Sequence, residues 1–271
     1  MDNPCAAHGF YALSDSQKTA FPSSRQHPTK SSQSCLQISS RVSHFKLETA
    51  KSRDEIAAAY KAEPWWHDLK GFFILTFAYN STLWEQLRFF GPNFGAKHLE
   101  VACGTGTLLE LVLRWRRWKA LPEVQIVGVD YADSMLAGAL RRFKGRACMD
   151  FQHADAANMP FDDASFDTVN IANAVHCFPD VRGAVADVFR VLKPGGTMAA
   201  NVLLYPRGFA PLRAIAARIN HWGVDKGILY TPYALPEILA ILSAAGFEIT
   251  TQTVSGNCAN VLARRPFLSA P

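Results

Sequence analysis

The chain has 271 residues, of which 49% are hydrophobic and 19% are charged, and its formal net charge is +5. This is ordinary globular composition, sufficient for one sizeable core. The net charge is too small to indicate a nucleic-acid partner without a concentrated basic patch. Apolar runs stay well short of the roughly 18 residues of a membrane span, so we expect no transmembrane segment.

The cysteines are scattered and form no CxxC pair, which excludes the usual spacing of a zinc site or a disulfide framework. Several lie inside apolar runs, so we expect buried, reduced thiols, no metal, and a cytoplasmic protein. The six positions are Cys5, Cys35, Cys103, Cys148, Cys177 and Cys258.

Residues 1–50 differ in composition from the rest of the chain. No acidic residue occurs between Asp15 and Glu48, whereas serine and basic residues are frequent. Such a segment is expected to be poorly ordered. It also has the composition of an organellar transit peptide, which leaves an organelle as the alternative compartment.

Residues 51–97 show helical patterns and are expected to form an N-terminal helical cap. Good helix formers precede Pro64, which should interrupt the first helix. Large apolar side chains then recur at spacings of three and four over 72–91. Tyr79 in this segment is a candidate to contact substrate.

From His98 onward, short apolar strands alternate with amphipathic helices. This rhythm predicts crossover units and a parallel sheet. Strands are expected at 98–103, 124–130, 149–155, 166–175 and 195–204, helices at 107–119, 134–144 and 181–192, and a final helix and two strands within 234–265.

The stretch after the first strand contains a glycine turn that opens a helix, a geometry that binds anions and nucleotides. No lysine follows Gly106, which excludes the phosphate loop, and the third glycine of the dinucleotide fingerprint is absent. A nucleoside needs only the close approach of the backbone. Asp130 ends the second strand, where a carboxylate can accept hydrogen bonds from ribose hydroxyls. Its alternative role is a helix N-cap, for which Asp133 is the stronger candidate.

Five blocks in order, "LEVACGTG", "GVDYADSML", "HADAANMPFDDASFDTVNIANAVHCF", "VFRVLKPGG" and "LSAAGFE", resemble the class I S-adenosylmethionine-dependent methyltransferases. The resemblance covers roughly residues 95–265 and is to the small-molecule branch that includes the ubiquinone/menaquinone-biosynthesis type. It implies a Rossmann-like α/β fold: a mostly parallel seven-stranded sheet with helices on both faces. It also implies a domain over 98–266 that binds S-adenosyl-L-methionine, and an insert at 206–228 that closes over the substrate.

The resemblance assigns cofactor roles residue by residue. Glu100 would orient the turn and the amino end of the methionine, and Asp130 would hold the ribose. The remaining candidates are Ala102, Cys103, Gly104 and Gly106 for the methionine and ribose, Tyr131 and Met135 for the adenine faces, Asp155 and Ala156 for the adenine edge, and Asn173 for the methyl end. Ala102 replaces the family's usual first glycine, and we expect the added methyl group to be tolerated.

His176 follows the fourth strand, where substrate and methyl group should meet, and is a candidate general base and substrate contact. The alternative is a structural histidine. We therefore expect a methyltransferase for a small aromatic or apolar molecule, modified at O, C or N. A protein of this fold that keeps the cofactor as a binding partner or cyclisation catalyst, or a nicotinamide-dependent reductase, would be the alternative.

Overall fold

Strands and helices alternate along the part of the chain that the computed structural model describes, residues 82–225 and 229–267. The elements predicted from His98 onward are present, with ends that differ by a few residues. Their bounds are α4 Leu83–Phe90, β1 Lys97–Val101, α5 Thr107–Trp118, β2 Gln125–Asp130, α6 Asp133–Arg142, β3 Met149–His153, β4 Phe166–Ile171, the 3-10 helix η2 Val175–Cys177, α7 Val181–Val191, β5 Leu192–Leu203, α8 Ala210–Asp225, α9 Leu235–Ala244, β6 Glu248–Ser255 and β7 Cys258–Arg264.

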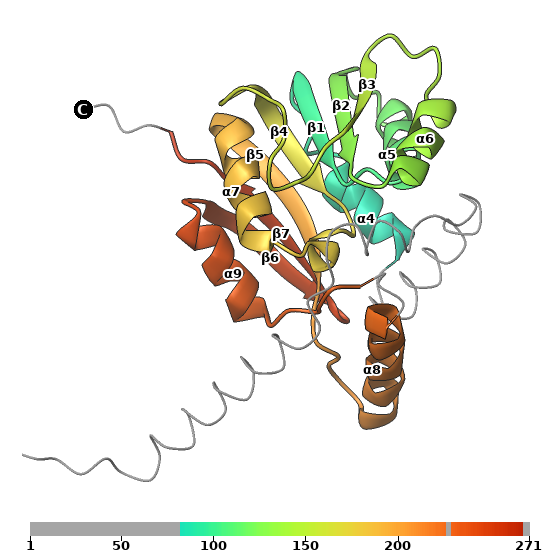
Figure 1. Cartoon of the computed structure of the whole chain (residues 1–271), viewed down its shortest axis with the longest axis vertical. Helices are drawn as coiled ribbons and strands as arrows, with labels where there is room; N and C mark the ends of the chain where they lie inside the picture. Colours follow the sequence, from blue (N-terminus) through green and yellow to red (C-terminus); the bar gives the residue numbers. More distant parts are fainter. Residues whose placement is uncertain (1–81, 226–228, 268–271) are drawn as a thin grey trace, which may run out of the picture. The chain divides into compact units, whose positions relative to one another are not determined.

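The seven strands form one sheet in the order β3-β2-β1-β4-β5-β7-β6 (Figure 1). Strands β1 to β5 pair in parallel, and β7 runs antiparallel to both β5 and β6. The expectation of a mostly parallel seven-stranded sheet is therefore confirmed. The chain leaves β1 toward β2 on one side and reaches β4 on the other. This reversal makes the carboxyl ends of β1 and β4 the usual place for a ligand.

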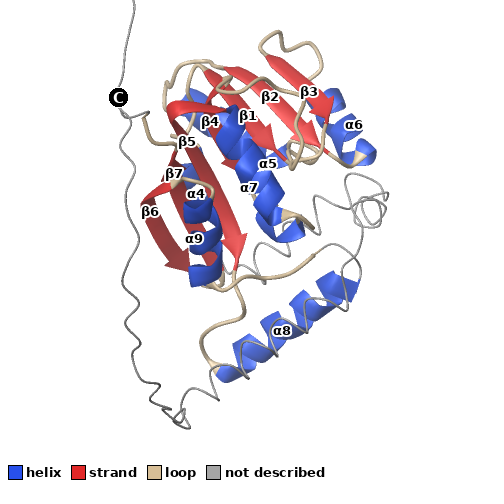
Figure 2. Cartoon of the chain, turned by 60° about the vertical axis from the view of Figure 1, so that its left-hand side comes forward, coloured by secondary structure: helices blue, strands red, loops and turns tan. Residues whose placement is uncertain are grey.

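Helices cover both faces of the sheet (Figure 2). Valines of α7 and isoleucines of α9 pack on Leu99, Val169 and Ile171 in the main core. The opposite face contacts α4, α5 and α6 through two smaller clusters centred on Phe90 and Phe143. Alternate residues of each strand point to opposite faces, so β1 and β4 contribute to both layers.

The fourth strand is shorter than the predicted span of 166–175. It ends at Ile171, and Asn173 adopts a left-handed conformation with φ +57° before the single turn of η2. Asparagine tolerates this region better than most residues, and one left-handed residue is enough to end an extended strand. The apolar residues Ala174 and Val175 are buried within the turn, not in the strand.

The described part of the expected cap is α4, which is joined closely to the sheet. Thr82 and Glu85 form a capping box at its start, with hydrogen bonds of 2.8 and 3.2 Å. Gln86 and Phe90 are buried whereas Leu83 and Trp84 are exposed, so α4 packs on the sheet through one side only. Residues 1–50, the first predicted helix before Pro64 and Tyr79 lie outside the described residues.

The predicted insert at 206–228 contains α8, whose exposed surface carries Phe209 next to its start and Ile215 and Trp222 within it. Ala216 and Asn220 are buried on its other side. The amphipathic character expected of this helix, with a polar outer side, is therefore not observed: the exposed side carries large apolar side chains and the buried side carries an asparagine. Within the described ranges, no helix has the length and apolar character needed to span a membrane.

Candidate functional site

The glycine turn joins β1 to α5 at the carboxyl edge of the sheet. Gly104 has φ +57° and Gly106 has φ +75°, conformations that glycine adopts without steric cost. A Cβ on Gly106 would collide with the ring of Phe143, whereas a Cβ on Gly104 would meet nothing within 4 Å. Packing against Phe143 therefore requires glycine at position 106. At position 104 the absence of a side chain leaves the backbone accessible to a ligand.

Ala102 also lies in the left-handed region, with φ +54°. An L-residue in this conformation costs about 1–2 kcal/mol because its Cβ approaches the following carbonyl oxygen. The expectation that alanine is tolerated here in place of the family's usual glycine stays a prediction. The cost of the alanine arises from the backbone conformation, which the sequence did not show.

Asp130 connects the ends of β1 and β2. Its carboxylate accepts hydrogen bonds from the backbone N–H of Gly104 at 2.7 Å and of Ala132 at 2.9 Å. Burial raises the pKa of Asp130, and the two N–H donors oppose this shift. Each oxygen retains a further lone pair, so the carboxylate can still accept two ribose hydroxyls.

The prediction that Asp133 caps α6 is wrong. Ala132 occupies the N-cap position, no side chain caps the helix, and Asp133 is its first residue. The Asp133 side chain is 92% exposed and lies 3.8 Å from His153. Asp130 instead bonds the N–H of Ala132, so the strand-end carboxylate fixes the entry to α6 as well as the glycine turn.

The two residues expected to enclose the adenine differ in accessibility. Tyr131 is half-buried, and its ring lies 5.2 Å from that of His153. Met135 is 6% exposed within α6, so it offers little surface to a ligand in this conformation. Tyr131 is thus the better placed of the two to cover an adenine.

Asp155 and Ala156 begin the loop between β3 and β4. Asp155 accepts a hydrogen bond from the N–H of Ala157 at 3.0 Å, and Ala156 packs partly on the main core. Ala154 donates its N–H to the carbonyl oxygen of Asp130 at 3.2 Å. The residues expected to read the adenine edge therefore follow directly after a residue that is hydrogen-bonded to the backbone of Asp130.

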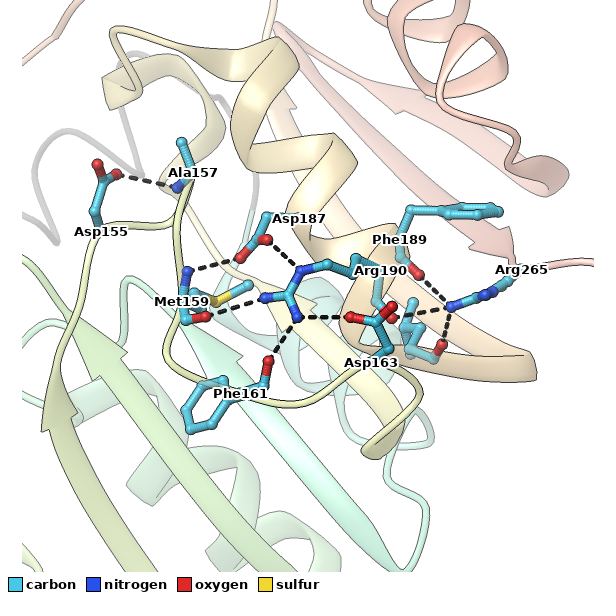
Figure 3. A network of polar contacts seen from close by, with 10 residues as sticks. Asp155, Ala157, Met159, Phe161, Asp163, Asp187, Phe189, Arg190 and Arg265 are labelled. Carbon is cyan, nitrogen blue, oxygen red and sulfur yellow. Dashed lines mark hydrogen bonds and ion pairs between the residues drawn. The ribbon is translucent and has the colours of Figure 1, made fainter.

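Sequence reasoning missed the side chain that holds this loop. Arg190 of α7 donates to the carbonyl oxygens of Met159 and Phe161 at 3.0 and 2.6 Å. It also donates to the carboxylates of Asp163 and Asp187 at 2.9 and 2.7 Å (Figure 3). These charge-assisted contacts hold the backbone that follows Asp155 against α7. Their spacing along the sequence gave no signal that they meet.

Asn173 lies in a cluster of amide side chains that the sequence also did not reveal. Its carboxamide exchanges two 3.2 Å hydrogen bonds with Gln86 of α4. Asn201 of β5 donates to the Asn173 side chain at 2.6 Å and accepts its backbone N–H at 2.5 Å. The residue expected at the methyl end is thus fixed from two sides.

His176 lies in η2, directly after this cluster. Burial lowers the pKa of His176 to about 3, so the imidazole is neutral at physiological pH. Its carbonyl oxygen accepts the N–H groups of Tyr230 and Thr231 at 2.9 and 3.1 Å. A base with so low a pKa abstracts protons poorly near neutral pH.

The described cysteines are free thiols that differ in burial. Cys258 is buried, Cys103 and Cys177 are half-buried, and Cys148 is exposed, contrary to the expectation of buried thiols. Burial, with the nearby charges of Asp130 and Glu100, raises the pKa of Cys103. This cysteine therefore stays protonated in the glycine turn and acts as a small apolar group.

Comparison with known proteins identifies the domain. The model of the methyltransferase domain family matches residues 99–200. The chain is 35% identical over 119 residues to a demethylmenaquinone methyltransferase of Clavibacter sepedonicus, covering 43% of this chain and 46% of the relative. The chain spans about half the length of the curated relatives that it matches.

Solved structures share the fold. A S-adenosylmethionine-dependent methyltransferase of Aquifex aeolicus aligns with a TM-score of 0.52 at 18% identity, covering 71% of this chain and 93% of that one. The cyclase SpnF aligns with a TM-score of 0.54 at 20% identity, covering 68% and 80%. Residues 99–200 therefore belong to the class I S-adenosylmethionine-dependent methyltransferase family, as distant homologues of the demethylmenaquinone and ubiquinone/menaquinone methyltransferases.

Proposed function

We propose that this chain is an enzyme that transfers a methyl group from S-adenosyl-L-methionine to an O, C or N atom of a small aromatic or apolar molecule. The observation that carries the proposal is the geometry of Asp130. Its carboxylate is held by the N–H groups of Gly104 and Ala132 at the carboxyl end of β2, beside the glycine turn that follows β1. Its remaining lone pairs match a pair of vicinal hydroxyls.

The neighbouring residues fit the rest of the cofactor. Gly104 leaves backbone open beside this carboxylate, and the first turn of α5 has no side-chain cap. Tyr131 offers a partly exposed ring for the adenine, and Asp155 with the Ala156 backbone would read its edge. Cys103 and Ala102 would line the methionine portion, and Asn173 would face the methyl end.

When bound, S-adenosyl-L-methionine supplies an electrophilic methyl group and a thioether leaving group. The protein would contribute alignment of the acceptor atom and exclusion of water. Because burial keeps His176 neutral, we propose that it orients the substrate and does not act as a strong base. Gln86 and Asn201 would hold Asn173 in place during the transfer.

Exposed aromatic residues at the end of β5 support an aromatic or apolar substrate. Tyr205, two residues after the end of β5, is 44% exposed, and Phe209, which directly precedes α8 in the insert, is 72% exposed. The curated relatives named for demethylmenaquinone favour the same class of substrate.

Isothermal titration of the full chain with S-adenosylmethionine tests the cofactor assignment. Asp130→Ala should weaken binding by about tenfold or more, because it removes hydrogen bonds to a charged group. Asp133→Ala is the matched control, since this carboxylate lies three residues away and is 92% exposed. It should leave the affinity unchanged. No binding by correctly folded wild type, judged by circular dichroism, would refute the assignment.

Product analysis separates methyl transfer from use of the cofactor as structure alone. The fold hosts a cyclase as well as methyltransferases, so architecture does not decide between them. Incubation with S-adenosylmethionine and a metabolite extract should give S-adenosylhomocysteine and a compound heavier by one methyl group. Cofactor binding without S-adenosylhomocysteine formation would favour the binding or cyclisation alternative.

A further inference from the structure

A network of buried, hydrogen-bonded polar groups precedes the glycine turn, and its central member is His98 of β1. His98 is 0% exposed. Its Nε2 lies 2.9 Å from Oε2 of Glu100, and its Nδ1 lies 2.8 Å from Oγ1 of Thr168 on the neighbouring strand β4. The N–H of Gly95 donates to the same Thr168 oxygen at 2.8 Å. The His98 network thus links the loop before β1 to Glu100, the acidic residue that opens the turn.

The donor and acceptor of each hydrogen bond in the His98 network follow from the chemistry of its groups. Burial lowers the pKa of His98, so the ring is neutral near pH 7 and has one donor and one acceptor nitrogen. A carboxylate only accepts, so Nε2 carries the hydrogen and donates it to Glu100. Nδ1 must then accept the hydroxyl hydrogen of Thr168. Every group has a partner with this single assignment, which favours one orientation of the ring.

Glu100 connects the His98 network to the proposed cofactor site. Glu100 is 5% exposed, and it precedes the turn residue Ala102 by two positions. The charge of Glu100 contributes to the raised pKa of Cys103, so the carboxylate is electrostatically close to the turn. His98 bonds one of the two carboxylate oxygens and thereby restricts the rotation of the group.

The ring of His98 is itself held by packing. The ring of Phe94 stacks on it with centroids 3.8 Å apart and an angle of 24° between the planes. The guanidinium of Arg116 lies over the Phe94 ring, 4.6 Å from its centroid. Packing and hydrogen bonding at His98 can therefore be perturbed separately, which makes the role of the hydrogen bond testable.

We propose that His98 is a positioning residue, which holds the Glu100 carboxylate in the orientation that binds the ammonium group of the cofactor's amino-acid tail. The proposal rests on the proposed function, because it concerns the same cofactor site. A fixed carboxylate gains a charge-assisted hydrogen bond without first losing rotational freedom. His98 would therefore affect ligands with an amino-acid tail and leave the adenosine portion alone.

Titration calorimetry with two ligands tests this distinction in the full chain. S-adenosylhomocysteine carries the amino-acid tail, and methylthioadenosine has the same nucleoside and thioether without it. In His98→Leu we expect the affinity for S-adenosylhomocysteine to fall about tenfold, with methylthioadenosine changed less than about twofold. His98→Gln retains an N–H donor and should recover most of the lost affinity.

Phe94→Leu is the matched control, because it removes the stacked ring and keeps the hydrogen bonds of His98. It should lower the melting temperature and leave the ratio of the two affinities unchanged. Equal weakening of both ligands in His98→Leu, or no weakening of either, would overturn the inference.

If His98→Leu does not fold, Thr168→Val decides the question, since it removes the hydroxyl that orients the ring. It should reduce affinity for S-adenosylhomocysteine by about threefold at constant methylthioadenosine affinity, and an unchanged ratio would overturn the inference. A wild-type chain that binds neither ligand would instead overturn the proposed function, on which the inference depends.

Discussion

The two faces of β1 and β4, the central strands of the sheet, differ in chemistry. On the face under α7 and α9, β1 and β4 present Leu99, Val101, Val169 and Ile171, all buried and apolar. On the face under α4 and α5, the alternate positions of the same two strands present His98, Glu100, Thr168 and Asn170, all buried and polar. Adjacent residues of one strand therefore lie in different environments.

The difference indicates a division of labour within the strands. Burial of apolar side chains is non-directional and stabilises the fold in proportion to the area removed from water. Buried polar groups are costly unless each is hydrogen-bonded, but a satisfied network favours one arrangement of its members. We infer that the apolar face mainly supplies stability and the polar face mainly fixes the geometry of the site.

The largest effect is expected on the apolar face. Leu99 lies between His98 and Glu100 in the sequence, but its side chain is on the opposite face and fully buried. Leu99→Ala should lower the free energy of unfolding by about 3 kcal/mol. Urea denaturation measures the loss, and Leu99→Met as a control should cost less than about 1.5 kcal/mol. The ratio of the affinities for S-adenosylhomocysteine and methylthioadenosine should not change. A changed ratio would contradict the division between the faces.

The second effect concerns the polar contacts at the rim of the apolar face. Arg190→Met removes four hydrogen bonds to the loop and to α7, and should cost about 2 kcal/mol of stability. Backbone amides of residues 154–165 should exchange hydrogen faster. Arg182→Met, an exposed position on the same helix, is the control. Unchanged exchange in the loop would show that Arg190 does not hold it.

The third effect tests the buried imidazole of His176 through pH. Because burial lowers its pKa to about 3, the unfolded chain binds a proton between about pH 6.5 and 3 that the folded chain does not. Stability is therefore lost as the pH falls through this window. Between pH 6 and 5 the wild type should lose about 1 kcal/mol more than His176→Gln. Parallel pH profiles in urea denaturation would refute a buried neutral histidine.

The smallest effect is expected in the glycine turn. Ala102→Gly relieves a left-handed alanine at about 1–2 kcal/mol, which is partly offset by the greater freedom of glycine in the unfolded chain. The net gain should be about 0.5 kcal/mol, measured as a small rise in melting temperature. Ala139→Gly in the buried interior of α6 should destabilise instead. Destabilisation by Ala102→Gly would show that the methyl group contributes packing that outweighs the strain.

The sequence by itself determined the order of strands and helices, the glycine turn and the carboxylate of Asp130. These features depend on local patterns: hydrophobic periodicity, residues that permit positive φ, and the position of an acid at a strand end. It did not give the end of β4, because a short apolar run has no periodicity that separates a strand from a buried turn. Nor did it give the N-cap of α6, because the helix begins one residue earlier than expected: Asp133 is its first residue, and the N–H groups of Met135 and Leu136 donate to the carbonyl oxygen of Ala132.

Only the tertiary structure decided which polar side chains support the site. Gln86 and Asn201 meet at Asn173 from positions 87 and 28 residues away in the sequence. Arg190 reaches the loop after Asp155 from α7, and His98 reaches Thr168 across 70 residues. A lone polar residue in an apolar strand or helix carries no sign of its partner, because hydrogen bonds depend on distances that exist only after the elements have packed.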